Sequence, residues 1–269
     1  MTVGDVDPAA EAVLRGGWGD RRAFFAFAVG HAECHPIVAV EDGAIVGTGV
    51  GTRNGAVGWV GTIFVAPERR GRGLGRALTE TVVAGLEADG CRTLVLVATE
   101  QGRPLYEKLG FEVQSRYQIF VAPGLAAGPP DPDVRAFTSA DLLGAAELDR
   151  RATGEDRLHL LHSCSGDGLA LADRSTGRLR GFVLRPPFRG GAVIAPDPDD
   201  ALRLLERRRV AAGLEGQARA GLLEANAAGR ERLLAAGWEE AWSAVRMARG
   251  APLTWQPAHI WGQYNFAIG

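Results

Sequence analysis

A proline-rich run near the middle of the chain limits the folds that this sequence can adopt. The run, PGLAAGPPDPD, extends from Pro123 to Asp133. Proline fixes φ, lacks a backbone donor and pushes the residue before it toward extended conformations, so no regular helix or strand can continue through it. We therefore expect two domains, residues 1–122 and 133–269, joined by a linker over 123–132, and each has an ordinary domain size.

The N-terminal half has the pattern of an α+β domain. Asp42-Gly43 and Asn54-Gly55 are hairpin signals that divide residues 36–65 into three antiparallel strands. Leu74, Leu78, Val82, Val83 and Leu86 recur at helical spacing. The full set expected is helices at 8–15, 20–30, 73–88 and 103–109, the three strands, and further strands at 93–98 and 111–121.

The C-terminal half repeats this order of elements with little shared sequence. We therefore expect an α+β fold made of two similar domains, each a mixed, mostly antiparallel sheet flanked by helices. The expected helices are 140–151, 156–162, 201–212 and 227–236, and the expected strands are 168–173, 179–185, 191–196, 221–225 and 238–249.

Charge and composition exclude several classes of partner. The formal net charge is −2, which gives no overall field that favours nucleic acid or an anionic membrane. No apolar run reaches the roughly 20 residues that a transmembrane helix needs. The three cysteines do not form a disulfide framework, and the two small His/Cys clusters lack the spacing of a zinc site. We expect a cytoplasmic protein without a metal, a nucleic-acid partner or a membrane partner; the clusters are His31, Cys34 and His35, and His159, His162 and Cys164.

The segment IFVAPERRGRGLGRAL, residues 63–78, carries the clearest chemical signal. A strand ends at Val65, a loop with glycines at 71, 73 and 75 follows, and a helix opens directly. Glycines let a backbone approach a ligand closely, and the first turn of a helix presents unpaired N–H groups at its positive end. Such a loop suits a pyrophosphate, and arginines at 69, 70, 72 and 76 add positive charge. The alternative is a tight strand–helix turn with solvated arginines.

The spacing excludes two other phosphate loops. A Walker loop needs Lys and Ser or Thr after its last glycine, whereas Arg76 follows Gly75. The dinucleotide fingerprint needs Gly-x-Gly-x-x-Gly, which Gly71, Gly73 and Gly75 do not provide.

The pair of motifs in this half resembles the GNAT acetyltransferase superfamily. Arg70-x-x-Gly73-x-Gly75 after a strand is similar to the family's acyl-CoA motif, and ATEQGRPLYEKLGF, residues 98–111, is similar to its second signature. The resemblance covers about residues 8–121. It implies acetyl-CoA as the donor, with backbone contacts from Ile63, Phe64 and Val65 to the acetyl carbonyl and pantetheine. It also implies contacts to the pyrophosphate from Arg70, Gly71, Arg72, Gly73, Leu74, Gly75 and Arg76.

The resemblance also implies that Tyr106 lies near the thioester sulfur. A tyrosine hydroxyl there could protonate the departing thiolate as a general acid; the alternative is a buried aromatic that anchors its helix. Two positions depart from the family pattern. Trp59 stands where many members have a glutamate base, and Glu100 stands where many have asparagine. No general base is assigned, although Glu68, Glu100, His31 and His35 lie in this half.

The C-terminal half resembles a degenerate GNAT-like domain in a tandem arrangement. Its counterpart of the CoA loop lacks the Arg-x-x-Gly-x-Gly pattern. It instead carries Asp197, Asp199 and Asp200, where a pyrophosphate needs positive charge, and Leu233 replaces the tyrosine. We expect one acetyl-CoA per chain, bound in the N-terminal half.

We therefore expect an N-acetyltransferase that transfers the acetyl group of acetyl-CoA to an amine of a small molecule. Two alternatives stay open. One is a non-catalytic acetyl-CoA-binding regulatory module, and the other is a protein N-acetyltransferase. We expect the enzyme to act as a monomer or a homodimer.

Overall fold

The computed structural model describes residues 1–188 and 190–269, and it divides into two compact units. The first unit contains Met1–Glu112, Met247–Pro252 and Phe266–Gly269. The second contains Val113–Arg246 and Leu253–Asn265.

These units differ from the boundaries expected at 122 and 133. The strand after residue 111 belongs almost wholly to the second unit, because it pairs there with a strand of the C-terminal half from Tyr117 to Pro123. Two short C-terminal segments belong to the first unit. The proline-rich residues 124–132 contain no helix or strand.

Strands and helices of the first unit follow the expected order. A meander of three antiparallel strands, β1 to β3, leads into α3 and then into β4, which is parallel to β3. The end of β11, Met247–Gly250, lies beside β4. The bounds are α1 Val6–Arg15, α2 Arg22–Gly30, β1 Cys34–Glu41, β2 Ala44–Asn54, β3 Val57–Val65, α3 Leu74–Ala88, β4 Thr93–Ala98 and α4 Arg103–Glu107.

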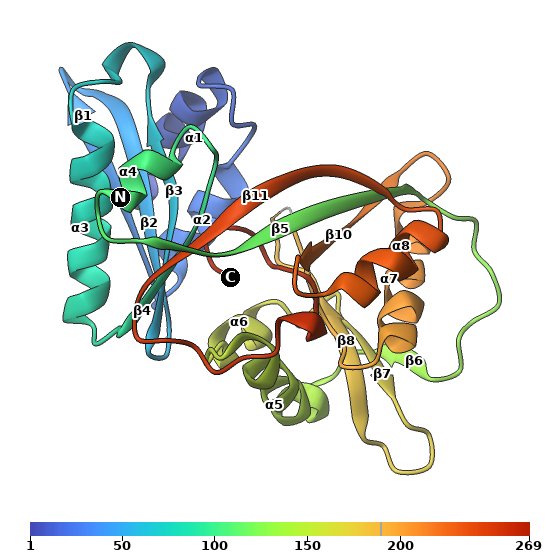
Figure 1. Cartoon of the computed structure of the whole chain (residues 1–269). Coiled ribbons are helices and arrows are strands. Elements are labelled where there is room, and N and C mark those ends of the chain that lie inside the picture. Colours follow the sequence, from blue (N-terminus) through green and yellow to red (C-terminus); the bar gives the residue numbers. More distant parts are fainter. Residues whose placement is uncertain (189) are drawn as a thin grey trace. The chain divides into compact units, whose positions relative to one another are not determined.

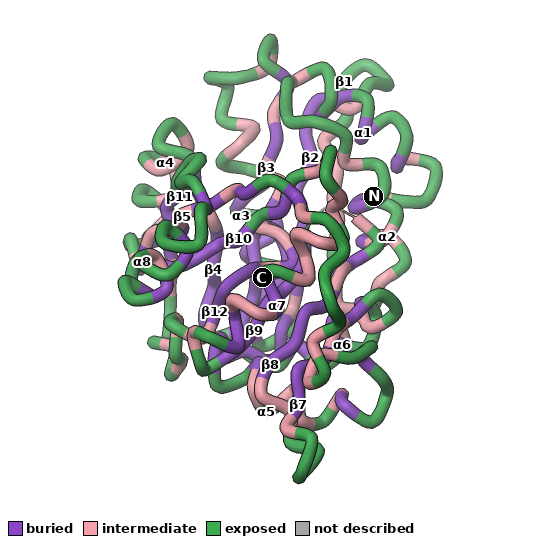
Figure 2. Tube along the Cα trace, turned by 90° about the vertical axis from the view of Figure 1, so that its right-hand side faces the viewer, coloured by how far each residue is buried: buried purple, intermediate pink, exposed green. Residues whose placement is uncertain are grey.

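Glycines on β2 let α3 pack closely on one face of this sheet. An ideal Cβ on Gly47 would lie 2.8 Å from Leu78 of α3, and one on Gly49 or Gly51 would lie 3.1 Å from Val82. Larger residues would hold the helix away. Helices α1 and α2 cover the other face, as Figure 1 shows. Strands β2 and β3 are therefore mostly buried (Figure 2).

The second unit contains a five-stranded sheet in the order β12-β9-β8-β7-β6. Strand β5 lies between β10 and the first part of β11, Glu239–Arg246. Helix α7 packs against β8, β9 and β10, and buried side chains such as Phe120, Leu204 and Trp261 form one core. The bounds are β5 Glu112–Pro123, β6 Val134–Ala136, α5 Leu142–Thr153, α6 Leu158–Ser163, β7 Leu169–Ala172, β8 Leu179–Leu184, β9 Ala192–Ile194, α7 Pro198–Ala212, β10 Gln217–Leu223, α8 Ala227–Ala235, β11 Glu239–Gly250 and β12 Ile260–Gly262.

The predicted α+β fold with two similar, mostly antiparallel domains is confirmed. Strand β6 was not predicted. The three cysteines are buried and unpaired with one another.

Candidate functional site

A β-bulge interrupts β3 close to its end. Thr48 lies opposite Phe64 and Val50 lies opposite Gly61, so Thr62 and Ile63 together face the single residue Gly49. Thr62 has φ 50°, an uncommon conformation for a β-branched residue. Strained backbone of this kind persists only where its surroundings hold it, and it clusters at functional sites.

Strands β3 and β4 separate just before the bulge. Their parallel pairing runs from Val57 opposite Thr93 to Val60 opposite Leu96. Beyond Val60, within the described residues, no strand pairs with that edge of β3. The opening between the two strands leaves residues 61–65 of β3 without a described neighbouring strand on that edge.

The three residues expected to contact the acetyl group and pantetheine alternate between the faces of the sheet. Ile63 faces α3, because an ideal Cβ on Gly49 would lie 3.1 Å from its Cδ1. Phe64 is fully buried on the α1 face, where its ring comes within 2.2 Å of an ideal Cβ on Gly16. Since their side chains are engaged in packing, a ligand in the opening would meet their backbone.

The glycine loop has the conformation expected of a phosphate cradle. Gly71 and Gly73 have φ 76° and 85°, and Gly73 is the residue immediately before α3. N–H groups of the first turn of a helix have no acceptor within it, and α3, with 15 residues, adds the positive end of its dipole. The protein itself does not require glycine at position 75. An ideal Cβ on Gly75 would meet Val65 and Leu105 only at ordinary contact distances of 3.6 and 3.7 Å.

Three of the four arginines around the loop already have partners, and Arg69, which is half-buried, pairs with Glu41. The Arg70 Nε donates to the Val65 carbonyl at 3.1 Å, which ties the loop to the end of β3. The Arg76 Nε donates to Glu80 at 2.8 Å along α3. Arg72 projects from the loop and is exposed.

Tyr106 lies on α4, next to the loop. Its neighbour Leu105 contacts the position of Gly75, and its ring makes an edge-to-face contact with Phe111 at 6.2 Å. Burial raises the pKa of Tyr106 to about 12. The hydroxyl is therefore protonated at neutral pH, which a general acid requires.

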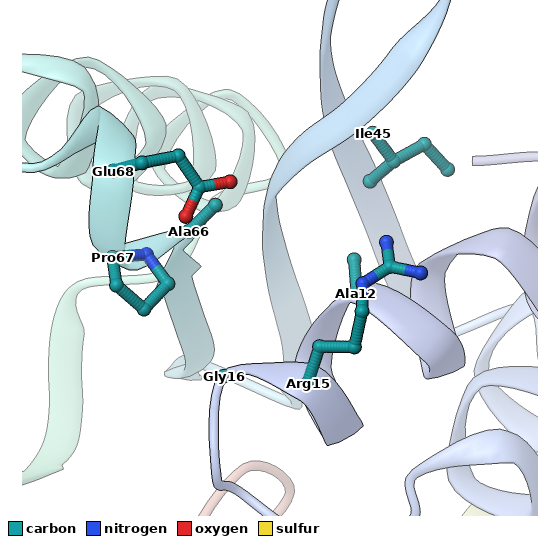
Figure 3. A pocket seen from close by; sticks show the side chains of 7 residues that line it. All are labelled: Ala12, Arg15, Gly16, Ile45, Ala66, Pro67 and Glu68. Atoms are coloured by element: carbon teal, nitrogen blue, oxygen red, sulfur yellow. The ribbon is translucent and has the colours of Figure 1, made fainter.

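No carboxylate occupies the strand position where the family often has its base. Trp59 stands there and is 1% exposed. Glu68 instead lines a pocket of about 160 Å³ between α1 and the end of β3, and Figure 3 shows it across that pocket from Arg15. The other candidates are occupied elsewhere: Glu100 lies 4.0 Å from Arg103, His35 lies 3.1 Å from Asp89, and the His31 Nδ1 accepts from the Glu33 N–H.

The corresponding helix start in the second unit is already capped. The Asp197 carboxylate accepts from the N–H groups of Asp199 and Asp200 at 2.9 and 3.2 Å. The buried Asp200 carboxylate is in turn held by Arg180 through hydrogen bonds of 2.9 and 2.6 Å. The Asp197 carboxylate thus uses helix N–H groups that a pyrophosphate would need.

The chain itself fills the strand opening of the second unit. Strand β12 pairs with β9, where Ile260 lies opposite Ile194. The Ala195 N–H donates to the His259 carbonyl, and the Gly191 N–H donates to the Gln263 carbonyl, both at 3.0 Å. On the other side, the Gln263 amide donates to the Gly221 carbonyl of β10 at 3.0 Å. The segment 259–263 thus occupies the place between β9 and β10 that corresponds to the opening between β3 and β4.

In the part of the chain that the structure describes, no helix is both long enough and apolar enough to cross a bilayer. Those residues also contain no group of three or more His, Cys, Asp or Glu side chains placed to hold a metal ion.

Two family models match the chain, one on each half. The acetyltransferase (GNAT) family matches residues 10–111, and a second acetyltransferase (GNAT) domain matches residues 145–262.

Curated relatives match over shorter stretches. The uncharacterised N-acetyltransferase YitH of Bacillus subtilis is 29% identical over 171 residues, which are 60% of this chain and 58% of the relative. The glucosamine 6-phosphate N-acetyltransferase of Trypanosoma brucei brucei is 41% identical over 66 residues, which are 24% of this chain and 45% of the relative. The chain thus spans about half the length of these relatives.

Solved structures share the fold over nearly the whole chain. A protein from Pyrococcus horikoshii has a TM-score of 0.84 at 19% identity, covering 100% of this chain and 94% of its own. A tandem GNAT protein of the clavulanic acid biosynthesis pathway has a TM-score of 0.61 at 16% identity, covering 93% and 95%. The chain belongs to the GNAT family of acetyltransferases and carries two GNAT domains in tandem.

Proposed function

We propose that the first unit binds acetyl-CoA and transfers its acetyl group to the amine of a small molecule. The observation that carries this proposal is the opening of the sheet at the Thr62 bulge, directly beside the glycine loop that starts α3. The N–H groups of residues 70–76 would receive the pyrophosphate, and the edge formed by Ile63, Phe64 and Val65 would align the pantetheine and the thioester.

In the proposed reaction, the neutral amine nitrogen attacks the thioester carbonyl carbon and forms a C–N bond. The oxyanion of the tetrahedral intermediate would be stabilised by backbone N–H groups at the β3 edge. The C–S bond then breaks, the CoA sulfur takes the Tyr106 hydroxyl proton, and the nitrogen releases one proton to water. The resulting tyrosinate takes a proton back from water, which restores the starting enzyme. The pKa of about 12 keeps that tyrosine protonated until it is used.

The second unit is proposed not to bind acetyl-CoA. Its helix start is capped by Asp197, and its strand opening is filled by residues 259–263. Either feature alone would compete with a bound CoA. Both agree with the missing glycine motif in this half, so we assign the domain a structural role.

A small-molecule acceptor is supported by one relative, which is named for acetylating the amine of glucosamine 6-phosphate. One observation favours a second candidate, an acetyl-CoA-binding module without catalysis. This observation is that the position of the usual strand glutamate is filled by buried Trp59.

A turnover assay separates the two candidates. Release of CoA thiol, followed with DTNB over a panel of primary amines, is measured beside a direct titration with acetyl-CoA. Amine-dependent thiol release that falls in a Tyr106→Phe variant supports the enzyme. Acetyl-CoA binding without release on any amine contradicts it and supports the binding module.

A further inference from the structure

The pocket drawn in Figure 3 lies next to the proposed thioester site. It has a volume of about 160 Å³ and is lined by the last turn of α1, by Ile45 of β2 and by residues 66–68. Residue 66 directly follows β3, whose end we assign to the pantetheine and the thioester. A ligand in this pocket would therefore be a neighbour of the bound acetyl-CoA.

The backbone on both sides of this pocket is held in place. On one side, the Ala66 N–H donates to the Val46 carbonyl at 2.9 Å. On the other side, α1 ends at Arg15, and the Gly16 N–H donates to the Ala12 carbonyl at 3.1 Å. The fold thus forms the pocket before a ligand arrives, which lowers the entropic cost of binding.

Two opposite charges face this space. Arg15 and Glu68 lie on opposite sides of the pocket, as Figure 3 shows. Both residues are exposed, and neither has an ion-pair partner among the described residues, unlike the nearby Arg69, which pairs with Glu41. A guanidinium and a carboxylate placed in this way suit a ligand that has both a carboxylate and an ammonium group.

The volume of the pocket limits how much of a ligand can enter. A water molecule in the liquid takes about 30 Å³, so a space of about 160 Å³ holds roughly five groups of that size. The head of a free α-amino acid consists of an ammonium nitrogen, the α-carbon and a carboxylate, which together are of this size. It also carries the two charges that Glu68 and Arg15 can neutralise.

An amino-acid head in the pocket would leave its side chain to reach the thioester. Residues 63–65 lie about 3–10 Å from Ala66 along the strand, because a strand rises by about 3.4 Å per residue. An extended side chain of several methylenes spans such a distance, whereas an α-amine held at Glu68 does not. The acetylated nitrogen would then be an amine at the end of the side chain.

We infer that this pocket binds the α-ammonium and α-carboxylate of a free amino acid that carries a side-chain amine, with Glu68 and Arg15 as the two contacts. This inference rests on the proposed function and names its acceptor class. A lysine inside a polypeptide cannot make the two contacts, because its α-amine and its carboxyl group are in peptide bonds. The inference therefore also separates a small-molecule acetyltransferase from a protein acetyltransferase.

Four amines that differ only in the head of the molecule test this assignment. L-Lysine has both charged groups, 6-aminohexanoate lacks the α-amine, cadaverine lacks the carboxylate, and pentylamine lacks both. In the wild type, kcat/KM should be highest for lysine. It should fall by about tenfold or more for each missing group, the usual effect of losing a hydrogen bond to a charged group. A wild-type kcat/KM for lysine that does not exceed the value for pentylamine would overturn the inference.

Each of two variants should abolish one of these differences. In Glu68→Gln, kcat/KM for lysine should fall to the level of 6-aminohexanoate, and in Arg15→Gln it should fall to the level of cadaverine. The Kd for acetyl-CoA should stay close to the wild-type value in both. Glu11→Gln is the matched control, because Glu11 is exposed on the same helix as Arg15 but does not line the pocket. It should keep the wild-type ratios.

The outcomes separate this inference from the proposed function. If Glu68→Gln and Arg15→Gln keep the wild-type ratios, the pocket assignment is wrong although the enzyme assignment stands. If the wild type binds acetyl-CoA but acetylates no primary amine, the proposed function itself fails, and the pocket assignment with it.

A second measurement uses the unaltered protein and does not depend on the variants. NMR of the lysine product locates the acetyl group. Acetylation of the side-chain nitrogen supports the predicted orientation, and acetylation of the α-nitrogen overturns it.

Discussion

The Thr48 hydroxyl donates a 2.9 Å hydrogen bond to the carbonyl oxygen of Thr62, the bulged residue of β3 at φ 50°. Thr48 is fully buried. One side chain on β2 thus holds the strained turn at which the sheet opens, and the proposed thioester site depends on it.

Thr48→Val should therefore reduce both stability and activity. Loss of a buried hydrogen bond lowers the free energy of unfolding by about 1 kcal/mol, and a relaxed bulge should lower kcat by about tenfold. Thr93→Val is the control, because its buried hydroxyl donates to the Ala251 carbonyl at 2.7 Å, at the far end of the β3–β4 pairing. Urea unfolding and steady-state kinetics should show a similar loss of stability in both variants but a loss of kcat in Thr48→Val alone. Equal kcat values for Thr48→Val and Thr93→Val would show that the bulge does not contribute to catalysis.

Two glycines of the loop should respond differently to substitution. Gly73 has φ 85°, so Gly73→Val should cost about 1–3 kcal/mol of stability and also weaken acetyl-CoA binding. Gly75 has room for a Cβ within the protein, so Gly75→Val should leave the fold stable and lower acetyl-CoA affinity by about tenfold or more. Gly85→Ala is the control, because Gly85 is exposed on the same helix and an added Cβ would meet no atom within 4 Å. It should leave the affinity for acetyl-CoA unchanged. Wild-type affinity in a folded Gly75→Val protein would remove the loop from the site.

Tyr106→Phe should lower kcat more than it raises the KM for acetyl-CoA, because the hydroxyl acts in the transition state. The folded pKa is raised by burial from 10.0 to about 12. The protonated, active form of Tyr106 therefore persists through neutral and moderately alkaline pH. The contribution of the protonated hydroxyl to folding stability is lost only as pH rises from about 10 through 12. A pH–rate profile should show no loss of an acid near pH 10. A descending limb near pH 10 that vanishes in Tyr106→Phe would contradict the raised pKa.

A buried ion pair should dominate the stability of the second unit. Arg157 donates two hydrogen bonds to Asp149, at 2.9 and 2.5 Å, and both side chains are at most 3% exposed. Asp149→Asn removes the charged carboxylate that binds the buried Arg157 guanidinium, which should cost about 3–5 kcal/mol. Glu147→Gln breaks an exposed pair with Arg151 on the same helix and should cost about 0.5 kcal/mol or less. Denaturant titrations that show similar losses for the two variants would contradict this difference.

Local sequence patterns predicted much of the fold. The helix expected at 73–88 is Leu74–Ala88, and the strand expected at 93–98 is Thr93–Ala98. Both segments have strong apolar patterns, so they can be predicted without knowing which distant residues pack against them. The strand expected at 221–225 is instead Gln217–Leu223, because pairing with β5 from Tyr117 to Pro123 decides its extent.

The features missed by the sequence depend on contacts between distant residues. The bulge at Thr62 arises from the register between β2 and β3, and no residue type within β3 marks it. Strand β6 has only three residues, and it exists because β7, more than 30 residues later, supplies its partners. The glycine loop of the site could be predicted because its backbone requirement is local. The close approach of Ala267 to Gly61 could not, because it depends on tertiary packing.

Isothermal titration with acetyl-CoA measures how many binding sites the chain has and in which unit they lie. We expect one site per chain, located in the first unit. Binding should be weakened by Gly75→Val and unchanged by Asp197→Ala, which removes the cap of α7 in the second unit. Two equivalent sites per chain, or a single site that Asp197→Ala weakens and Gly75→Val does not, would contradict this expectation.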